Sequence, residues 1–551
     1  MVIAPAVRGA TPRAAIATRI KKRWSELMAA KQLHVPVWAN CYRMTYPTRG
    51  AGLESDMLTA TEAQQQKARI YDSTAPDSVK TGVATLMGAM VPANALWFGL
   101  DVGNESEEER RWLEDAAKFI WENIHASNFD AEACDGMIDE FVAGWFVLFL
   151  DEKPEGGFYF EAWPVGECCV ASSRSGGLVD TVFRKYSYSV SQCVLTFGYD
   201  NCSEDTRKKY DNEQFDEKVC IVHAIEPRQL YDVNSRTAKN MPFSSCHVEE
   251  SSGHLLRESG FHEFPCMVPR WMRLPGSAYA TGPMSDALPD VMSLNEAKKW
   301  TLMGAETAIA PPMIAKDDGV LNPRTIKLGP RRIIVADDVD SMKPLITGAN
   351  VQTGMLTVDD LRASIRKILL ADQLPPAEGQ VRTAYEWSVR VQALRQMLGP
   401  MFGRFQSEFL QALIERAFGL MWRANARNGF TLVGRPPQSL SNRNFTIRYL
   451  SPLARAQKLG DVDAMDRYEM SLVQAAQVDP SVLDVYDWEE GERERGLLLG
   501  VPQKLVRDKR ATALVRKAKA DAAQAQQQQA MQMQAQVTEQ DAMAQRMASA
   551  A

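Results

Sequence analysis

Two pairs of adjacent carboxylates are the residues of this sequence that could hold a catalytic metal ion. Asp337 and Asp338 follow an apolar run, and Asp359 and Asp360 stand near the expected start of a helix. Paired carboxylates can bind divalent cations, so a metal-dependent nucleic-acid enzyme is one possible interpretation. Neighbouring acids on a loop or a helix cap are more often solvated surface groups. The enzyme is therefore the less favoured alternative.

A second set of potential metal ligands is formed by Cys246, His247 and His254, which fall in the segment 234–260. The Ser, Gly and His content of this segment predicts an exposed polar loop, and no further ligand stands at a zinc-like spacing. The sequence also lacks a phosphate loop, a GxGxxG motif after a strand, an HExxH motif and a GxSxG motif. We therefore expect no catalytic residue, no metal and no cofactor.

Length, charge and cysteine usage narrow the class of protein. A chain of 551 residues exceeds a single hydrophobic core and predicts roughly two to four folding units. Its net charge of −6 argues against a protein that coats nucleic acid, which would be basic overall. Nine cysteines without a CxxC pair predict reduced thiols. No apolar run approaches the ~18 residues of a membrane helix, and the amino-terminal residues show no secretion signal.

Helical and strand patterns succeed one another along the chain and predict an α+β fold. Helices are expected at 17–47 with a break near Pro36, from Asp77 or Ser78 to Pro92, twice within 105–144, and at 285–309, 358–372, 383–427 and 453–500. Strands are expected at 97–102, 145–150, five times within 156–275, and at FTLVG and FTIRYLSP. The stretch 503–551, rich in Ala, Gln and Met, indicates a helix with a Gln-rich tail.

The break LADQLPPAEGQVR (370–382) separates two of these helices, the second of which is expected to kink at Pro400. Pro375 and Pro376 block a helix here, and Gly379 frees the backbone. A polar loop held between two helices is suited to contact something large and variable. Beyond Pro400, apolar residues recur at helical spacing and predict a buried face: Phe402, Phe405, Phe409, Leu413, Ala417 and Leu420.

A locally basic module at 313–350 stands between the helices 285–309 and 358–372. Its charge could belong to a solvated strand face or could meet nucleic acid or an acidic partner, and both interpretations stay open. The two helices would bring the ends of the module together, so that it projects like a knob on a two-helix stalk, an arrangement that suits a ring protein. The basic residues are Lys316, Arg324, Lys327, Arg331, Arg332 and Lys343.

The chain resembles the portal (head-to-tail connector) proteins of short-tailed bacteriophages of the podovirus type. The order and spacing of several segments along nearly its whole length carry the resemblance, and none of them is a catalytic signature. They include RWSELMAAKQLHVPVWANCYRMTYPTRG, IYDSTAPDSVKTGVATLMGAMVPANALWF, VPRWMRLPGSAYATGPMSDALPDVMSLNEAKK, LLADQLPPAEGQVRTAYEWSVRVQALRQMLGPMFGRFQSEFL, YLSPLARAQK and GVPQKLVRDKRATALVRKAKADAAQAQQQQA.

The resemblance implies a non-enzymatic protein that forms a homododecameric ring at one capsid vertex, the head–tail junction of the virion, after assembly in the host cytoplasm. Double-stranded DNA would pass through the axial channel, without sequence specificity, during packaging and ejection. The implied partners are the terminase large subunit, tail adaptor or tube proteins, and capsid and scaffolding proteins. A non-portal assembly or scaffold protein is the alternative, although the Gln-rich tail lacks the sustained heptads of a coiled coil.

The resemblance also implies a portal fold with named parts. They are an amino-terminal helical segment (1–69), a β-rich wing (70–282), a first stem helix (283–312), a small clip (313–350), a second stem helix (351–371), a tunnel loop (372–382), a long wing or crown helix (383–430), a crown (431–502) and a barrel-like helix with its tail (503–551).

Two further sets of residues receive a role from the resemblance. The tunnel loop would meet DNA through Gln373, Leu374, Pro375, Pro376, Glu378, Gln380 and Arg382. Trp300, Met303, Ile368 and Leu369 on the stem helices are candidates for the interface between subunits, and burial within one subunit is the open alternative.

Overall fold

The computed structural model shows helices and antiparallel strands in two compact units, which confirms the α+β class. The first unit comprises Met1–Trp97 and Lys118–Val433, and the second Phe98–Ala117 and Gly434–Ala551. The residues that the structure describes are 12–54, 59–102, 107–174, 176–231, 237–309, 313–315, 342–344, 351–373, 401, 403–442, 446–449, 452–477, 479–499, 512–524 and 526–529.

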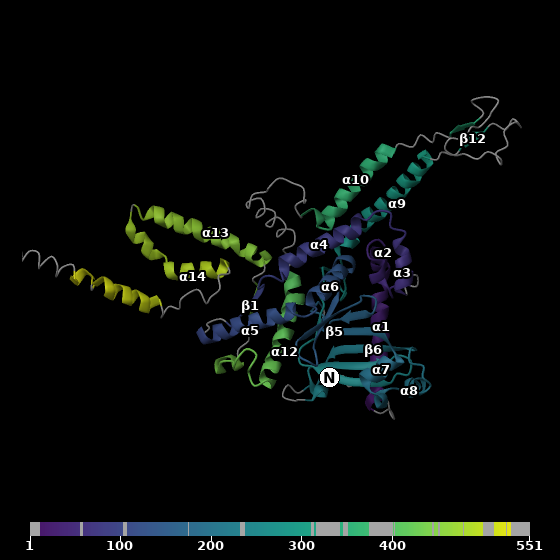
Figure 1. Cartoon of the computed structure of the whole chain (residues 1–551), viewed down its shortest axis with the longest axis horizontal. Helices are drawn as coiled ribbons and strands as arrows, with labels where there is room; N and C mark the ends of the chain where they lie inside the picture. The colour runs from purple at the N-terminus through teal and green to yellow at the C-terminus, as the bar shows by residue number, and fades with distance from the viewer. Residues whose placement is uncertain are drawn as a thin grey trace, which may run out of the picture. The chain divides into compact units, whose positions relative to one another are not determined.

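A five-stranded antiparallel sheet is the largest sheet of the first unit (Figure 1). Its strands follow one another in chain order, so each connection joins neighbours in the sheet. The helices α7 (Val190–Phe197) and α8 (Glu204–Asp211) interrupt the order between the second and third strands. The strands are β4 (Cys168–Ala171), β5 (Thr181–Ser189), β6 (Lys218–Pro227), β7 (Phe243–Glu249) and β8 (Leu255–Phe261).

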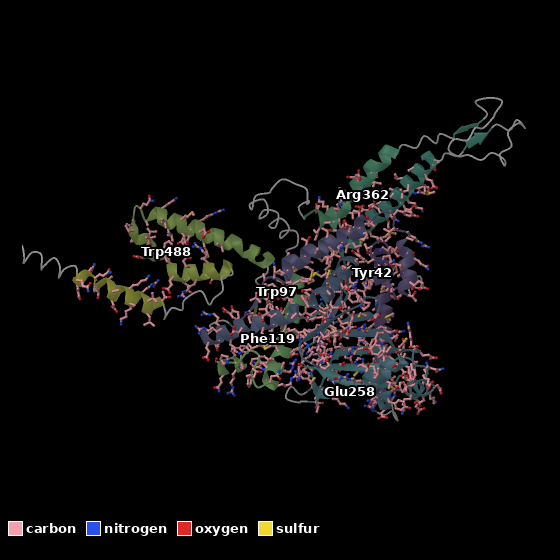
Figure 2. All side chains as sticks on the ribbon, viewed as in Figure 1. Tyr42, Trp97, Phe119, Glu258, Arg362 and Trp488 are labelled. Atoms are coloured by element: carbon pink, nitrogen blue, oxygen red, sulfur yellow. The ribbon has the colours of Figure 1, made fainter. Side chains whose placement is uncertain are left out.

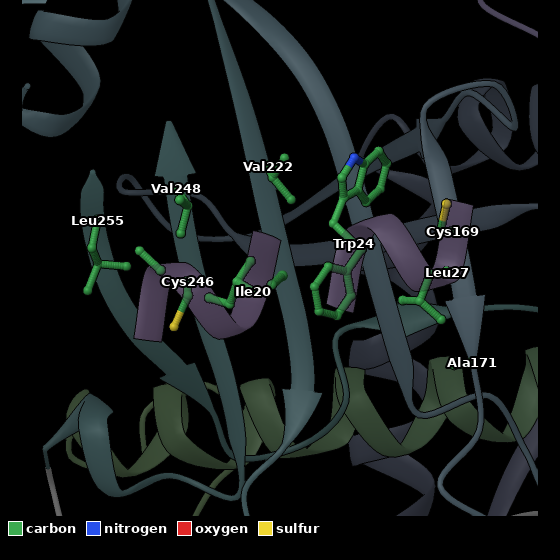
Figure 3. Packing of buried hydrophobic residues seen from close by; sticks show 12 residues of the cluster. Ile20, Trp24, Leu27, Cys169, Ala171, Val222, Cys246, Val248 and Leu255 are labelled. Atoms are coloured by element: carbon green, nitrogen blue, oxygen red, sulfur yellow. The ribbon is translucent and has the colours of Figure 1, made fainter. Parts of the chain in front are cut away.

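Helix α1 (Pro12–Gln32) covers one face of this sheet (Figure 3). Ile20, Trp24 and Leu27 recur at three- and four-residue steps and therefore share one side of the helix. They pack with strand residues such as Val222 and Val248 in one buried cluster. Helix α2 (Val35–Arg43) follows with Pro36 in its first turn, where proline is tolerated, so the predicted break near Pro36 is confirmed.

The prediction that 234–260 forms an exposed loop is wrong for most of its length. Strands β7 and β8 occupy much of this segment and complete the five-stranded sheet. Ser244, Ser245 and Cys246 are buried in β7. The strand pairs with a neighbour on each side, so its backbone N–H and C=O groups are hydrogen-bonded although these residues are buried.

A smaller sheet of the first unit has the order β3-β2-β9, formed by β2 (Val147–Glu152), β3 (Phe158–Trp163) and β9 (Cys266–Met267). Helix α6 (Phe129–Ala143) leads into it and ends at Gly144, whose φ of 89° favours glycine. A Cβ atom at Gly144 would also meet the backbone of Thr281 at 2.3 Å. The short strands β10 (Met272–Arg273) and β11 (Ala280–Thr281) pair nearby in sequence.

Most of the predicted helices are present, with shifted ends. Helix α4 begins at Thr74 with Ser73 as its N-cap residue, so the predicted caps Asp77 and Ser78 lie inside it. Helix α9 contains Pro289, as predicted, and α10 begins earlier than the expected Val358. These helices are α4 (Thr74–Met90), α5 (Glu107–His125), α9 (Pro283–Ile309) and α10 (Val351–Ile368). Helix α3 (Ala60–Lys67) was not predicted.

Helix α12 (Gln411–Arg427) follows a single π-helical turn at Gln406–Leu410. The predicted buried face is confirmed for Phe405, Phe409, Leu413, Ala417 and Leu420, which are all buried. Residues 374–400, with the predicted kink at Pro400, and Phe402 of the predicted buried face lie outside the described part of the chain.

In the second unit, strands far apart in the sequence pair with each other. β1 (Phe98–Asp101) lies antiparallel to β14 (Thr446–Tyr449). The stretch FTLVG at 430–434, where the first unit ends, was expected to be a strand and instead forms turns and bends. The predicted helical region 453–500 contains α13 (Pro452–Ala475) and α14 (Trp488–Leu499). Residues 512–524 and 526–529 are helical, in agreement with the predicted helix at the start of 503–551.

All nine cysteines are free thiols, as their spacing predicted. Of the helices in the described ranges, none is both long enough and apolar enough to cross a membrane.

Candidate functional site

Helices α9 and α10 pack side by side and form a two-helix stalk, which we call the stem pair (Figure 1). α9 leads out to β12 (Met313–Ala315), and α10 follows β13 (Met342–Pro344). The two short strands form an antiparallel ladder in which Ile314 lies opposite Lys343. The chain therefore leaves and returns at the same end of the stem pair, as the sequence predicted for the helices around 313–350.

An ion pair anchors the other end of the stem pair. Arg362 of α10 (Figure 2) donates from Nη2 and Nε to Oδ2 of Asp72, at 2.7 and 3.2 Å. Asp72 is almost fully buried just before α4, and its Oδ1 accepts a hydrogen bond of 2.9 Å from the backbone N–H of Thr74. Burial alone would raise the pKa of Asp72, but the hydrogen bonds from Thr74 and Arg362 hold it below its ordinary value.

Three further hydrogen bonds join the two helices of the stem pair to each other and to the segment before α4. The hydroxyl of Ser364 on α10 donates to Oδ2 of Asp290 on α9 at 2.7 Å. Asn295 of α9 accepts a hydrogen bond from the backbone N–H of Tyr71 at 2.7 Å and donates to the backbone oxygen of Arg69 at 3.1 Å. A buried amide that uses both its donor and its acceptor fixes the position of the helix that carries it.

The end of α10 packs closely against α4. A Cβ atom at Gly82 of α4 would meet the backbone oxygen of Leu369 and Cε1 of Phe141, both at 2.6 Å. Glycine is thus what lets α4 approach the last turn of α10. Leu370 follows with a φ of 60°, which reverses the chain into a short 3₁₀ turn at Ala371–Gln373.

Of the predicted tunnel-loop residues, Gln373 lies in this turn. The other six, Leu374, Pro375, Pro376, Glu378, Gln380 and Arg382, are outside the described residues. Of the predicted basic residues at 313–350, Lys343 lies in β13, whereas Lys316, Arg324, Lys327, Arg331 and Arg332 are also outside the described residues. The structure therefore describes only the first two residues of the predicted tunnel loop, 372–373, and the two short strands β12 and β13 of the basic module.

The stem pair carries large apolar side chains in contact with solvent. Trp300 of α9 is 64% exposed and Met303 is 48% exposed, and Leu302 between them is exposed as well. Ile368 of α10 is half-buried. Leu369 is fully buried inside its own chain. For this residue, burial within one subunit is therefore the correct alternative. Trp300 and Met303 are thus available to a second molecule, and Leu369 is not.

No sequence pattern marks the residues that anchor the stem pair. Asp72 and Arg362 stand 290 positions apart, and each resembles an ordinary surface charge. Only the burial of the Asp72 side chain, which is 4% exposed against 30% for Arg362, distinguishes this pair from ordinary surface charges. Leu302 was likewise missed, although it lies between two predicted residues.

Neither set of potential metal ligands forms a site in the described part of the chain, where no group of three or more His, Cys, Asp or Glu side chains is placed so that it could hold a metal ion. Cys246 packs in the cluster under α1, while the adjacent His247 faces the opposite side of β7 and a cavity. Asp359 pairs with Arg362 at 3.1 Å. Asp337 and Asp338 lie outside the described residues.

Comparisons with known proteins give relatives across most of the chain. It is 26% identical over 515 residues to the "Probable portal protein" of Bordetella phage BPP-1, covering 91% of this chain and 90% of the relative. It is also 26% identical over 489 residues to the "Portal protein" of Salmonella phage epsilon15, covering 85% of both chains. A chain from the "Neck of empty GTA particle" is 12% identical, with a TM-score of 0.37 over 78% of this chain and 90% of that one.

A family model described as "Bacteriophage head to tail connecting protein" matches residues 17–506. This match overturns the alternative of a metal-dependent enzyme, because the family is structural, and it replaces the alternative of a non-portal scaffold. The chain belongs to the family of bacteriophage head-to-tail connecting proteins, the portal proteins, and is a non-enzymatic component of the head–tail junction of the virion.

Proposed function

We propose that the chain assembles into a closed ring, a dodecamer, that forms the channel for genome packaging and ejection at one capsid vertex. The observation that carries the ring is the exposed apolar surface of α9 at Trp300 and Met303, which stand three positions apart and so share one side of the helix. Large apolar side chains grouped on a projecting helix favour burial against another molecule. In a ring, each such patch meets a different patch on the neighbouring subunit.

We further propose that the stem pair is the stem of a portal subunit and that 313–350 is its clip. The tunnel loop is then 372–382, held at its start by the contact of α10 with α4. The first unit contains most of the proposed wing (70–282), whereas 98–117 groups with 434–551, which contains most of the proposed crown (431–502) and the barrel-like helix (503–551). The amino-terminal segment 1–69 contributes α1, which covers the wing sheet, and 383–430 contributes α12.

The proposed channel needs weak contacts with DNA that do not depend on sequence. A net charge of −6 disfavours tight phosphate binding over the whole ring, so DNA can slide. Polar and basic residues of the tunnel loop, Gln373, Gln380 and Arg382, would make phosphate contacts that break easily, with Leu374, Pro375 and Pro376 as apolar bulk.

The proposed partners at the clip are the terminase large subunit and later the tail adaptor. The basic residues Lys316, Arg324, Lys327, Arg331, Arg332 and Lys343 would meet one of these proteins or the DNA itself. Capsid and scaffolding proteins complete the proposed set of partners, with assembly in the host cytoplasm.

The mass and symmetry of the purified full-length chain test this proposal. Native mass determination combined with class-averaged electron micrographs is expected to show a closed ring of twelve subunits with an open axial channel. A closed ring with another subunit number would refute the dodecamer and leave the channel. A monomer or dimer under all ionic conditions would refute the ring.

A further inference from the structure

Two cysteine side chains are in contact in the segment that joins β5 to β6. Residues 190–217 leave the five-stranded sheet after β5, form α7, a short 3₁₀ turn (Tyr199–Asn201) and α8, and return at β6. Sγ of Cys193, in α7, lies 4.0 Å from Sγ of Cys202, which follows the turn. Two sulfur atoms at this distance touch each other. The proposed ring interface, clip and tunnel loop do not include these residues.

The local sequence explains why the two thiols meet. Val190, Cys193 and Phe197 stand three and four positions apart, so they share the buried side of α7. Gly198 then reverses the chain with a φ of 86°, a value that favours glycine. Its backbone oxygen accepts a hydrogen bond of 3.3 Å from the Cys202 thiol. The turn therefore returns Cys202 to the side of α7 that carries Cys193.

Both cysteines also help to fill an apolar cluster. They are fully buried together with Val219, Ile221 and Leu256 of the sheet. A single buried thiol behaves as a small apolar side chain. Two thiols in contact have a further property, because rotation about their Cα–Cβ bonds can bring the sulfur atoms to the bonding distance of about 2 Å. The pair is thus placed to be oxidised to a disulfide.

The position of the segment on the surface gives an oxidant access to these thiols. Helices α7 and α8 have eight residues each, fewer than the roughly 12–15 that make an isolated helix stable in water. Leu195 and Tyr199 are exposed, and so are all residues of 211–217. A short surface segment of this kind opens locally more often than the sheet beneath it. Local opening exposes the sulfur atoms while the sheet stays folded.

The buried state of the thiols makes their oxidation slow but does not prevent it. Burial, together with the neighbouring Cys202, raises the pKa of Cys193 to about 12, and burial also raises the pKa of Cys202. Because the thiolate is the nucleophile, the closed segment reacts little at neutral pH. Once one thiol has reacted, the other lies beside it, so the second step is intramolecular and fast.

We propose that Cys193 and Cys202 form a redox-sensitive pair, which closes into a disulfide within the chain when the protein meets a disulfide oxidant such as oxidised glutathione. One cysteine thiolate attacks a sulfur atom of the oxidant, forms a mixed disulfide and releases one molecule of reduced glutathione. The second cysteine attacks the sulfur of the first and releases another. Two protein thiols are oxidised, one glutathione disulfide is reduced, and the two thiol protons pass to the released glutathione.

The disulfide links α7 to the residue before the N-cap of α8 and so restricts the opening of this segment. A reducing cytoplasm keeps thiols reduced, whereas disulfides persist outside the cell. The pair is therefore reduced while the ring assembles in the host cytoplasm, and it closes after the virion is released. This timing rests on the proposed function. Closure itself is a property of the single chain, so its failure is distinguishable from a failure to form the ring.

Peptide mapping of the full-length protein without reduction tests the proposal. The protein is incubated at pH 8 with millimolar glutathione, either mainly reduced or mainly oxidised, and its free thiols are then alkylated before digestion. The oxidised buffer is expected to join the peptides of Cys193 and Cys202, and the reduced buffer to leave both thiols free. Free thiols in the oxidised buffer, or a separate glutathione on each, would overturn the proposal. A disulfide that persists in the reduced buffer would overturn the redox sensitivity.

Two variants test whether contact between the thiols, rather than access alone, directs the reaction. Cys134→Ser is the control, because Cys134 is only half-buried and so more accessible, and this variant is expected to form the same disulfide as the unmodified protein. In Cys202→Ser, Cys193 is expected to stay free or to carry glutathione. A disulfide between Cys193 and a third cysteine in that variant would overturn the proposal.

Hydrogen exchange of the unmodified protein gives a readout that needs no variant. The amides of α7 and of the turn after it are expected to exchange at least about tenfold more slowly in the oxidised chain, because a short disulfide loop restricts the opened segment. The amides of α12 are the internal control and should exchange equally in both forms. Equal exchange of the α7 amides in the two forms would refute the link between α7 and α8.

Discussion

Arg270 and Glu408 form a buried ion pair with two parallel hydrogen bonds. Nη2 of Arg270 lies 2.6 Å from Oε1 of Glu408, and Nε lies 2.9 Å from Oε2, with 2% and 7% of the two side chains exposed. The remaining donors of Arg270 reach the backbone oxygens of Gly177 at 3.0 Å and Ala278 at 3.4 Å. The pair connects the π-helical turn before α12 to the segment that precedes β10.

Removing one partner of this pair is expected to destabilise the first unit strongly. Glu408→Gln leaves the buried guanidinium without its counter-charge, which costs about 3–5 kcal/mol. Urea unfolding followed by circular dichroism measures the loss. Because two apolar residues leave no unpaired charge, Arg270→Met combined with Glu408→Leu is expected to be less destabilising than Glu408→Gln. A Glu408→Gln variant as stable as the unmodified protein would contradict the assignment.

Glu140 is expected to make stability fall as pH rises. It is fully buried in α6, its Oε2 has no hydrogen-bond partner in the described residues, and burial together with Glu408 raises its pKa to about 8. The folded chain therefore keeps this proton between about pH 4.5 and 8 while the unfolded chain releases it. Over this range the group removes stability at about 1.4 kcal/mol per pH unit.

Glu140→Gln removes this titration. The free energy of unfolding of the variant, relative to the unmodified protein, is expected to increase from pH 5 to pH 8 and then to level off. Unfolding in urea at several pH values measures the difference, which cancels the contributions of all other titrating groups. Parallel pH profiles for the two proteins would show that Glu140 ionises normally.

Asp72→Asn is expected to loosen the base of the stem pair. The lowered pKa of Asp72 means that its ion pair with Arg362 stabilises the fold above the ordinary pKa of aspartate. That contribution disappears as pH falls through the lowered value. At pH 7 the substitution is expected to cost about 1–3 kcal/mol, and less at pH 3. Hydrogen exchange of the α10 amides measures the local loss.

Asp359→Asn is the matched control for this prediction. Asp359 pairs with the same arginine at 3.1 Å, but its side chain is exposed. Exposed pairs contribute about 0–1 kcal/mol. If both variants exchanged at the same rate as the unmodified protein, Asp72 would not anchor α10.

Two glycines of α4 are expected to respond in opposite ways to alanine. A Cβ atom at Gly82 would meet the Leu369 backbone oxygen and the Phe141 ring at 2.6 Å, whereas at Gly88 it would meet nothing within 4 Å. Gly82→Ala is expected to cost about 1–3 kcal/mol through overpacking. Gly88→Ala is expected to gain up to about 1 kcal/mol through helix propensity. Thermal unfolding compares the two, and a stable Gly82→Ala variant would refute the close packing of α4 on α10.

Polar substitution on α9 is expected to weaken the ring without weakening the subunit. Trp300→Ser with Met303→Ser should increase the fraction of small oligomers in native mass spectra, because both exposed side chains lose apolar area. The unfolding transition of the subunit should stay unchanged. Leu195→Ser, at an 82% exposed position in α7, is the control and should assemble normally. Normal assembly of the α9 variant would exclude this surface from the interface.

Local patterns in the sequence were enough to predict most of the helices. They also predicted that the chain has no set of catalytic residues. Phe405, Phe409 and Leu413 predicted the buried face of α12, because a helix places residues three and four apart on one side. The stem pair was predicted in the same way, since prolines and polar breaks limit its two helices. The order of the matching segments indicated the portal family before any contact was known.

Tertiary packing decided what those patterns could not express. Strand β7 was mistaken for a loop because its Ser, Cys and His residues carry no strand signal, and they are buried only through pairing with β6 and β8. β1 pairs with β14 across more than three hundred residues, which no local pattern specifies. Arg184, His223, His247 and Arg257 lie opposite one another in adjacent strands only because of the register in which those strands pair. A sheet brings distant residues together through hydrogen bonds of the backbone, which every residue type except proline can make.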